Sequence, residues 1–203
     1  MRRELKTPLA LAVLNLLNER SMHPYEMQQM MRERGHDQVI KLKGGSLYGT
    51  IERLAAAGLI EPLETSREGR RPERTVYAIT EAGGDELMIW LRELLSEPAH
   101  EYPWFGAALA FMAAVPPEEA LRLLERRSMI LEAEVAAADS MLQNMERSGL
   151  PRLFGVESEY IQAMHRAELA WVRQIIDDMN SGKLEWPEEA LQLLKRSSEE
   201  KRP

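Results

Sequence analysis

The sequence predicts a mainly α-helical protein with one small two-stranded sheet, built as an N-terminal domain over residues 1–95 and a helical C-terminal domain over residues 96–203. Three observations predict this organisation. The first half holds four amphipathic helical patterns and one pair of β-type segments. The second half has apolar residues at helical spacing and no strand signal. The segment SEPAHEYP, residues 96–103, carries the prolines expected of a boundary.

The first three helices are predicted from their ends. Thr7 is placed to cap a helix over TPLALAVLNLLNE, and Pro8 suits its first turn. HPYEMQQMMRER predicts a second helix, which Pro24 opens and Gly35 ends. SLYGTIERLAAAG, which follows two glycines, predicts a third helix over residues 46–58.

A hairpin and a fourth helix complete the first half. LIEPLE and RTVYAIT are short β-type segments, and Gly69 and Pro72 between them suit a long hairpin loop. Thr80 is placed to cap EAGGDELMIWLRELL, whose acidic residues lie in the early turns, as the helix dipole favours. Three helices, a hairpin that serves as a wing and a further helix are the element order of a winged helix-turn-helix.

Two long helices are predicted in the second half, with a shorter apolar segment, PWFGAALAFMAAV, that should form a buried helix before them. Residues 116–149 keep an apolar heptad pattern for four heptads, and residues 156–182 resume it after the break at GLPR. Helices joined by a tight break pack antiparallel, and a leftover apolar stripe favours a second copy of the chain. The expected homodimer interface is formed by Leu121, Leu124, Leu131, Val135, Leu142, Met164, Trp171 and Ile175.

The composition excludes several kinds of site. The chain has no cysteine, which excludes thiol catalysis, thiolate metal sites and disulfides, and a cytoplasmic protein is expected. The longest uncharged apolar run, between Glu101 and Glu118, contains Pro103 and Gly106 and is too short to span a membrane as a helix.

The net charge of −7 is unevenly distributed. Residues 1–95 carry 14 Lys/Arg and 14 Asp/Glu, whereas residues 96–203 carry 12 and 19, so the acidity lies in the second half. Residues 67–74 hold four arginines and two glutamates, a local net charge of +2. A nucleic-acid partner is therefore compatible with the first half, although the overall charge argues against one.

The third helix has a narrow outward face. Leu47, Ile51 and Leu54 share its buried face, and small residues gather opposite them near the N-terminal end. Such a helix suits the DNA major groove, because bulky side chains would hold the backbone away from the bases. The DNA contacts expected from this helix are Gly45, Ser46, Tyr48, Gly49 and Arg53.

The hairpin loop supplies positive charge beside that helix. We expect its arginines to reach phosphates or the adjacent minor groove of double-stranded DNA. These residues are Arg67, Arg70, Arg71 and Arg74. Tyr25, in the HPYEM segment, completes the expected DNA contacts.

These motifs resemble the PadR family of bacterial winged-helix repressors. HPYEM is similar to the family's His-Gly-Tyr-Glu element, GGSLYGTIERLAAAGLI to its recognition helix ending in Gly-Leu-Ile, and GRRPERTVYAITEAG to its Gly-Arg-Pro wing. The likeness covers roughly residues 7–95 and continues more loosely through AELAWVRQIIDD. It implies a homodimer that binds a pseudo-palindromic operator, represses transcription and is released by a small, often aromatic, effector.

Two positions depart from the family pattern. Pro24 replaces the usual glycine after His23, and Gly49 stands where proline is common. A glycine makes the recognition helix softer by about 1 kcal/mol relative to alanine. Its fit to DNA is therefore expected to be partly induced.

Aromatic side chains suggest where an effector would bind, because pockets lined by them hold flat apolar molecules. The candidate pocket residues are Trp90, Trp104, Phe105, Phe111, Tyr160 and Trp171. Trp90 and Trp104 flank the joint between the halves. The alternative is that aromatic residues at helical spacing fill the core.

No catalytic or metal-binding pattern is present in the sequence. The four histidines are scattered, and the pair formed by His165 and Glu168 lacks the further ligands that a metal site needs. Gly44 and Gly45 are not followed by the Gly-Lys-Ser/Thr of a phosphate loop. Neither an enzyme nor a cofactor is expected. The alternative function is a winged-helix module that binds proteins through its hairpin, with the C-terminal helices as a scaffold.

Overall fold

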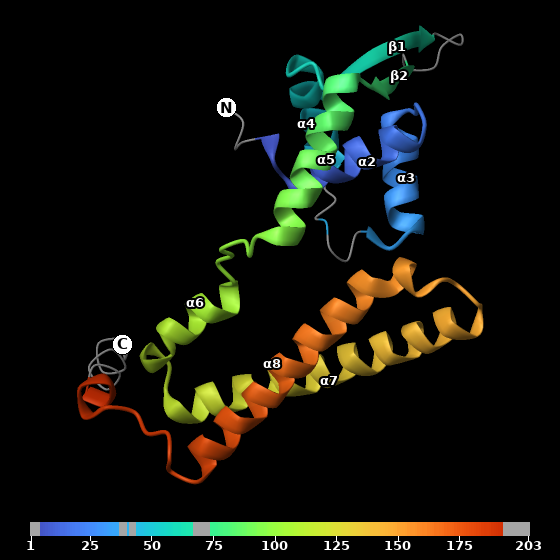
Figure 1. Ribbon diagram of the computed structural model, residues 1–203. Helices are drawn as coiled ribbons and strands as arrows, with labels where there is room; N and C mark the ends of the chain where they lie inside the picture. The colour runs from blue at the N-terminus through green and yellow to red at the C-terminus, as the bar shows by residue number, and fades with distance from the viewer. Residues whose placement is uncertain (1–4, 37–39, 41–43, 67–73, 193–203) are drawn as a thin grey trace. The chain divides into compact units, whose positions relative to one another are not determined.

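The computed structural model describes residues 5–36, 40, 44–66 and 74–192. The chain forms two compact units, Met1–His100 and Glu101–Pro203, and each is considered by itself. Unit 1 combines helices with one two-stranded antiparallel sheet, and unit 2 is helical throughout its described residues (Figure 1). Among the helices that the structure describes, none is both long and apolar enough to cross a membrane.

Unit 1 is organised around α2 (Pro8–Glu19), which α3 (Pro24–Glu33), α4 (Gly44–Ala56) and α5 (Glu81–Ser96) surround. The Thr7 side chain caps α2 by accepting a hydrogen bond from the backbone N–H of Ala10 at 3.1 Å. The core is almost wholly aliphatic. Its largest buried members are Val13, Leu14, Leu16, Met22, Met27, Met31, Ile51, Leu54, Ile60 and Leu87.

The end of α4 directs the chain into the sheet. Gly58 has a φ of 71°, in the left-handed region that favours glycine. Its N–H donates to Ala55 O at 2.9 Å, and the N–H of Leu59 donates to Leu54 O at 3.0 Å, which closes the helix. Strand β1 (Ile60–Ser66) then pairs antiparallel with β2 (Arg74–Ile79), with a register shift between Pro62 and Glu64. The predicted wing therefore follows α4 directly.

The wing is attached to the segment that precedes α3. Met22 and Tyr77 exchange two backbone hydrogen bonds, both of 3.1 Å. The Nδ1 atom of His23 lies 3.1 Å from the carbonyl oxygen of Thr75. Strand β2 is therefore fixed to the start of α3. A single long-range residue pair has no periodicity, so the sequence pattern gave no sign of this attachment.

The start of α5 packs closely on the end of α4. The Thr80 hydroxyl donates to Gly58 O at 2.7 Å and accepts from the N–H of Gly83 at 3.1 Å. A Cβ atom at Gly83 would lie 1.9 Å from Leu59 O and 2.9 Å from Ile79 Cγ1. Position 83 therefore has no room for a side chain.

Two ion pairs fasten the connection between α2 and α3. Arg34 donates to both carboxylate oxygens of Glu19, at 2.5 and 2.7 Å, and Arg20 donates to Glu26 at 2.5 Å. The hydrogen bond from each arginine is the main reason that the pKa of its glutamate is lowered. Because all four side chains are partly exposed, each pair contributes modestly to stability.

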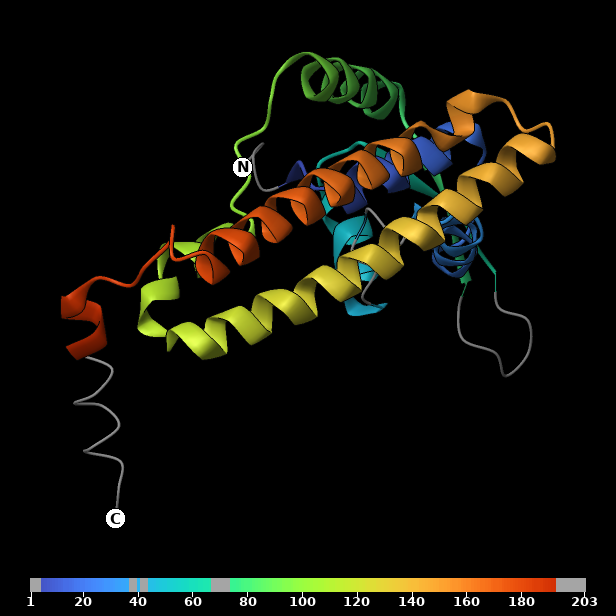
Figure 2. The same cartoon turned by 90° about the horizontal axis from the view of Figure 1, so that it is seen from below.

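Unit 2 is a hairpin of two long helices. It begins with α6 (Trp104–Ala110) and the short helix η2 (Met112–Ala114), followed by α7 (Pro117–Arg147), η3 (Arg152–Gly155) and α8 (Val156–Asn180). Helices α7 and α8 lie side by side and antiparallel, as predicted (Figures 1 and 2). Leu124, Leu131, Leu169 and Val172 are buried between them. Beyond α8, the indole N–H of Trp186 donates to Val115 O at 2.9 Å.

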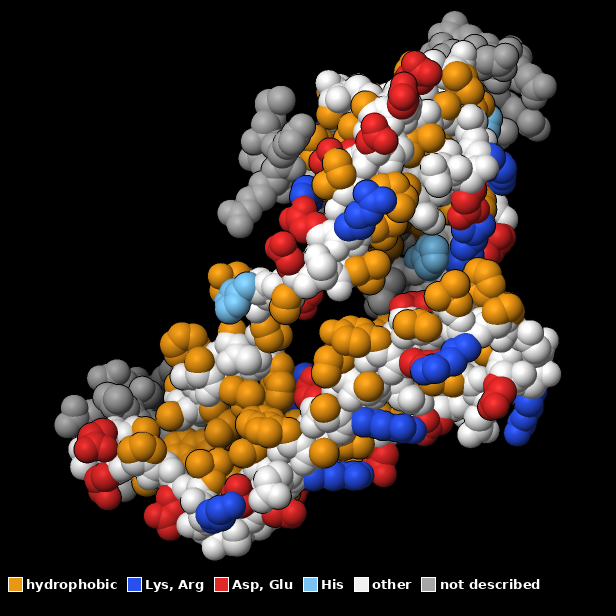
Figure 3. Space-filling model, viewed as in Figure 1, with side chains coloured by type: hydrophobic (Ala, Val, Ile, Leu, Met, Phe, Trp, Pro, Cys, Tyr) orange, Lys and Arg blue, Asp and Glu red, His pale blue; other side chains and the backbone are white. Residues whose placement is uncertain are grey.

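The segment from Pro103 to Val115 differs from the prediction of a single buried helix. Helix α6 ends at Ala110, and neither α6 nor η2 contains a buried residue. Phe105 and Met112 pack against the hairpin core, but Trp104 is 91% exposed. Figure 3 shows hydrophobic side chains gathered over this part of unit 2. A short helix on a two-helix hairpin has only one face covered, so an apolar pattern all round did not ensure burial.

Candidate nucleic-acid interface

The outer face of α4, defined as Gly45, Ser46, Tyr48, Gly49 and Arg53, is accessible as the sequence predicted. Four of these residues are exposed and Gly49 is half-buried. The Tyr48 ring is 57% exposed, although tyrosine is a large and partly apolar side chain. Nothing lies within 4 Å of a Cβ atom built at Gly45, so the leading edge of the helix is open. This shape suits close approach to a grooved, polar surface.

The inner face of α4 holds the helix against the rest of unit 1. Leu47, Ile51 and Leu54 are buried there, as predicted, in the core that they share with α2 and α3. Thr50 is buried with them and is only 2% exposed. The sequence placed Thr50 at the flank of the helix, and a lone threonine gave no signal that its hydroxyl would be enclosed. Helix α4 is therefore held by four side chains.

Arg53 folds back along the outer face of α4. Its Nη2 atom donates to the Thr50 hydroxyl at 2.9 Å, and its Nη1 atom lies 3.7 Å from where a Cβ atom of Gly49 would be. The guanidinium therefore lies over Gly49, one helical turn before its own Cα. Side chains in a helix generally lean towards its N-terminus, so this direction needs no strain.

Tyr25 lies at the start of α3, directly after the buried Pro24, and its side chain is 73% exposed. Helix α3 precedes α4 in the chain, and the two pack together through Met27, Met31 and the inner face of α4. The phenol of Tyr25 is therefore available to a partner of unit 1.

The arginines of the wing fall mostly outside the described residues. Arg67, Arg70 and Arg71 belong to residues 67–73, which the structure does not describe. The backbone of Arg74 begins β2, but its side chain is also outside the description. The structure thus fixes the two strands that carry the loop and leaves the contacts of its arginines as predictions.

The six aromatic residues of the predicted effector pocket lie in different surroundings. Trp90 is 3% exposed in the core of unit 1, where its indole N–H donates to Glu86 at 2.5 Å. Trp104, Phe111 and Tyr160 are exposed in unit 2. Phe105 and Trp171 meet edge to face with their ring centroids 6.1 Å apart, and the Arg127 guanidinium lies 3.6 Å from the Phe105 centroid. Trp90 therefore serves as a core residue, and only Phe105 and Trp171 form a contact pair.

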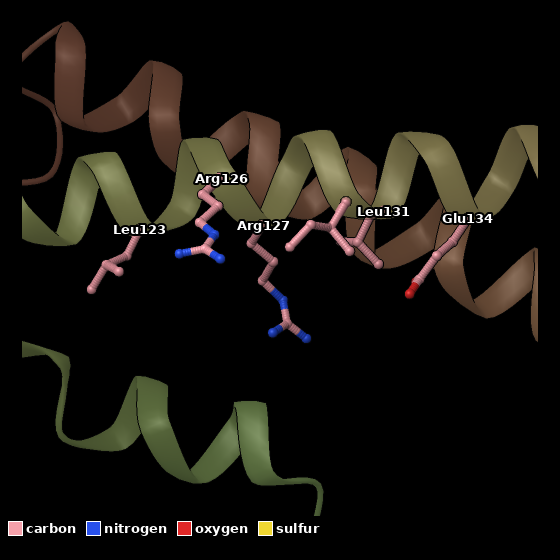
Figure 4. Close-up of a pocket in the computed structure, with 6 residues that line it drawn as sticks. Leu123, Arg126, Arg127, Leu131 and Glu134 are labelled. Carbon is pink, nitrogen blue, oxygen red and sulfur yellow. The ribbon is translucent and has the colours of Figure 1, made fainter.

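Two hollows in unit 2 are lined by other residues. A shallow one of about 220 Å³ runs along α7 beside Leu123, Arg126, Arg127 and Ile130 (Figure 4). A larger one of about 600 Å³ lies where α7 meets η3 and α8, beside Leu142, Met145 and Arg152. None of the six predicted aromatic residues lines either hollow.

The predicted dimer residues divide between the inside and the outside of the hairpin. Leu124 and Leu131 are buried in the core of a single subunit, so they have no free surface for a second one. Leu121, Val135, Leu142 and Ile175 are half-buried. Met164 and Trp171 are exposed on α8, as is Tyr160. The hairpin uses the heptad stripe of α7 for its own packing, and the outer stripe of α8 is left uncovered.

Metal ligands do not converge in the described part of the chain, where no three His, Asp or Glu side chains are grouped as a site.

Comparison with known proteins agrees with this geometry. Residues 13–88 match the sequence profile of the "Transcriptional regulator PadR-like family". The match covers α3, α4, both strands and most of α5. No curated protein shows significant sequence similarity to the chain.

Solved structures share the fold over most of the chain. PadR of Bacillus subtilis in complex with operator DNA is 18% identical, with a TM-score of 0.64 over 83% of this chain and 97% of that one. The same protein in complex with p-coumaric acid gives 18% and 0.67, over 86% and 99%. The virulence activator AphA of Vibrio cholerae gives 16% and 0.66, over 85% and 98%.

At these identities the structural likeness establishes the fold, a winged helix followed by a helical unit, and confirms the predicted fold class. The DNA and the p-coumaric acid are ligands of the Bacillus protein. The family match through the winged helix confirms the resemblance that the HPYEM, GGSLYG and GRRPER motifs indicated. Through residues 13–88, this chain belongs to the PadR-like family of transcriptional regulators, a family of regulators and not of enzymes.

Proposed function

We propose that this chain is a repressor that binds a pseudo-palindromic DNA operator as a homodimer and is released by a small aromatic effector. The observation that carries the proposal is the outer face of α4, which exposes a thin edge with Tyr48 and Arg53 while four buried side chains fix the helix. The expected DNA contacts are Gly45, Ser46, Tyr48, Gly49, Arg53, Tyr25, Arg67, Arg70, Arg71 and Arg74.

The attachment of the wing supports DNA binding by two elements at once. Hydrogen bonds of Met22 and Tyr77, and of His23 and Thr75, hold β2 against the start of α3. Helix α4 would enter the major groove, and the arginine-rich loop would reach phosphates beside it. The fold that this chain shares with the operator-bound Bacillus protein is consistent with this arrangement.

The uncovered stripe of α8 supports a homodimer. Tyr160, Met164 and Trp171 expose apolar surface that a monomer gains nothing from showing to water. A twofold dimer would present two α4 helices to successive major grooves of one operator. The outer stripe of α8 is therefore our proposed centre of the interface.

An aromatic effector is proposed at the Phe105 and Trp171 pair. The two rings and the nearby guanidinium of Arg127 offer apolar faces and a positive charge for a flat acid. The Bacillus protein that binds p-coumaric acid has the same fold. A change of packing at this pair would alter the spacing of the two α4 helices and weaken both half-site contacts together.

The first experiment is titration of fluorescent duplex DNA, both non-specific and from upstream of the protein's own gene. Binding should weaken steeply as salt is added, and Arg70→Ala with Arg71→Ala should lower the salt slope by about 1 for each lost phosphate contact. A chain that binds no duplex at low salt would refute the proposal and favour the protein-binding module. Release of bound DNA by aromatic acids, absent with aliphatic acids of the same charge, tests the effector.

A further inference from the structure

The Thr50 hydroxyl occupies an unusual place in α4. It is buried, and its oxygen donates its only hydrogen to Ser46 O at 2.7 Å. Its remaining capacity is as an acceptor, and the Nη2 atom of Arg53 uses it at 2.9 Å. The direction of both hydrogen bonds is therefore fixed by the chemistry of a hydroxyl group.

The bond from Arg53 determines where the guanidinium lies. Gly49 has no side chain, and the nearest Arg53 atom is 3.7 Å from the position that a Cβ would take. The cation therefore lies on bare helix backbone between Gly49 and Thr50, close to the small residues of the outer face. Without the Thr50 acceptor, nothing printed by the geometry of α4 would hold this long side chain in one rotamer.

We infer that Thr50 is a positioning residue that presets Arg53 for contact with a DNA phosphate, an inference that rests on the proposed function. A guanidinium has five N–H donors, and the bond to Thr50 uses one. The donors left over remain for a phosphate oxygen. A side chain that is already ordered loses less conformational freedom on binding. Thr50 thus contributes to DNA affinity without touching DNA.

The test uses four variants of the full-length protein with a non-specific duplex. Thr50→Val keeps the shape and removes the hydroxyl, and should weaken binding about threefold to tenfold per subunit, the cost of ordering one long side chain. The salt slope should stay unchanged, because Arg53 still reaches its phosphate. Arg53→Ala should lower that slope by about 1 per subunit. Thr50→Ser, which retains an acceptor, should restore binding to within about twofold.

The double variant separates positioning from a structural role. In the Arg53→Ala background, Thr50→Val should cause no further loss, because it acts only through the guanidinium. An equal loss in both backgrounds, or wild-type binding by Thr50→Val while Arg53→Ala binds weakly, would overturn the inference and leave the proposed function standing. Wild-type protein that binds no duplex would instead refute the proposed function itself. Thermal unfolding of every variant shows whether a loss comes from the fold.

Discussion

Gly83 shows how much one missing side chain decides in unit 1. The N-terminus of α5 approaches the end of α4 so closely that a Cβ atom would lie 1.9 Å from a backbone oxygen, Leu59 O. A backbone atom cannot rotate away as a side chain can. Gly84, the next residue, has nothing within 4 Å of the same position. The two neighbouring glycines therefore have opposite requirements.

Gly83→Ala is expected to lower the free energy of unfolding by about 3 kcal/mol, because α5 must move off the sheet to admit the methyl group. Gly84→Ala is the matched control. It should be neutral or raise stability by about 0.5 to 1 kcal/mol, since alanine is the better helix former. Urea denaturation of both variants gives the comparison, and equal stabilities would contradict the close packing at position 83.

Sequence reasoning at this scale succeeded where a residue has a local role. Thr7 and Thr80 were identified as caps because their hydroxyls serve a backbone N–H three residues later, and both do so. It missed Thr50 and Gly83 because their roles depend on what lies opposite them. The burial of Thr50 follows from packing against α2 and α3, which no pattern within α4 contains.

The wing depends on its attachment to the start of α3. β1 and β2 form only a two-stranded sheet, which is marginal by itself, and the Met22 to Tyr77 pair extends it. The ring of His23 adds a contact to Thr75 O. The position of the loop arginines is therefore set in part by a residue outside the hairpin.

His23→Ala should loosen the wing without unfolding the chain. We expect faster amide exchange at Met22 and Tyr77 and a loss of stability of about 1 kcal/mol, the usual contribution of one hydrogen bond. Hydrogen exchange followed by mass spectrometry measures the change. His165→Ala, in unit 2, is the control and should leave exchange in the wing as it was.

The connection of α2 to α3 should respond to acid. Glu19 and Glu26 have a lowered pKa in the folded chain, so their pairs stabilise it above the usual glutamate pKa of 4.5, and this contribution is lost as the pH falls below that value. The double variant Glu19→Gln, Glu26→Gln should be less stable than wild type at pH 7 by under about 1 kcal/mol per pair. Urea midpoints at pH 7 and 3.5 measure this, and a difference that does not shrink in acid would exclude the pairs as its cause.

Elements were predicted well where ends and periodicity agree. α2, α7 and α8 begin and end within a few residues of their signals, since caps, prolines and glycines act locally. The segment of α6 and η2 was wrong because the break at Phe111 has no proline or glycine to announce it. The heptad pattern of α7 was real, but periodicity does not say which helix will cover it. The partner proved to be α8 of the same chain.

The chain as a whole has its negative charge in the half that is not proposed to bind DNA. Residues 96–203 carry 12 Lys/Arg and 19 Asp/Glu, against 14 and 14 in residues 1–95. Several of these acids are neutralised within the hairpin, where Glu168 pairs with Arg127, Asp139 with Arg166, and Glu132 with Arg173. DNA is therefore attracted to one half of the molecule only.

Self-association should depend on the outer stripe of α8. Met164→Glu places a charge on that stripe and should weaken the proposed dimer about tenfold or more, since an unpaired charge is costly to bury. Asn15→Asp adds the same charge on the exposed side of α2 and should have no effect. Sedimentation equilibrium of both variants decides the matter, and a Met164→Glu protein that associates like wild type would place the interface elsewhere.

The hydrogen bond from Trp186 to Val115 O has a mechanical consequence for unit 2. It clasps the chain beyond α8 to the residue just before α7, while η3 closes the opposite end of the same hairpin. Two rods joined at both ends cannot slide lengthwise past each other. Any signal that crosses this unit must therefore tilt or bend the pair as one beam, and shear between its helices is excluded while the clasp holds.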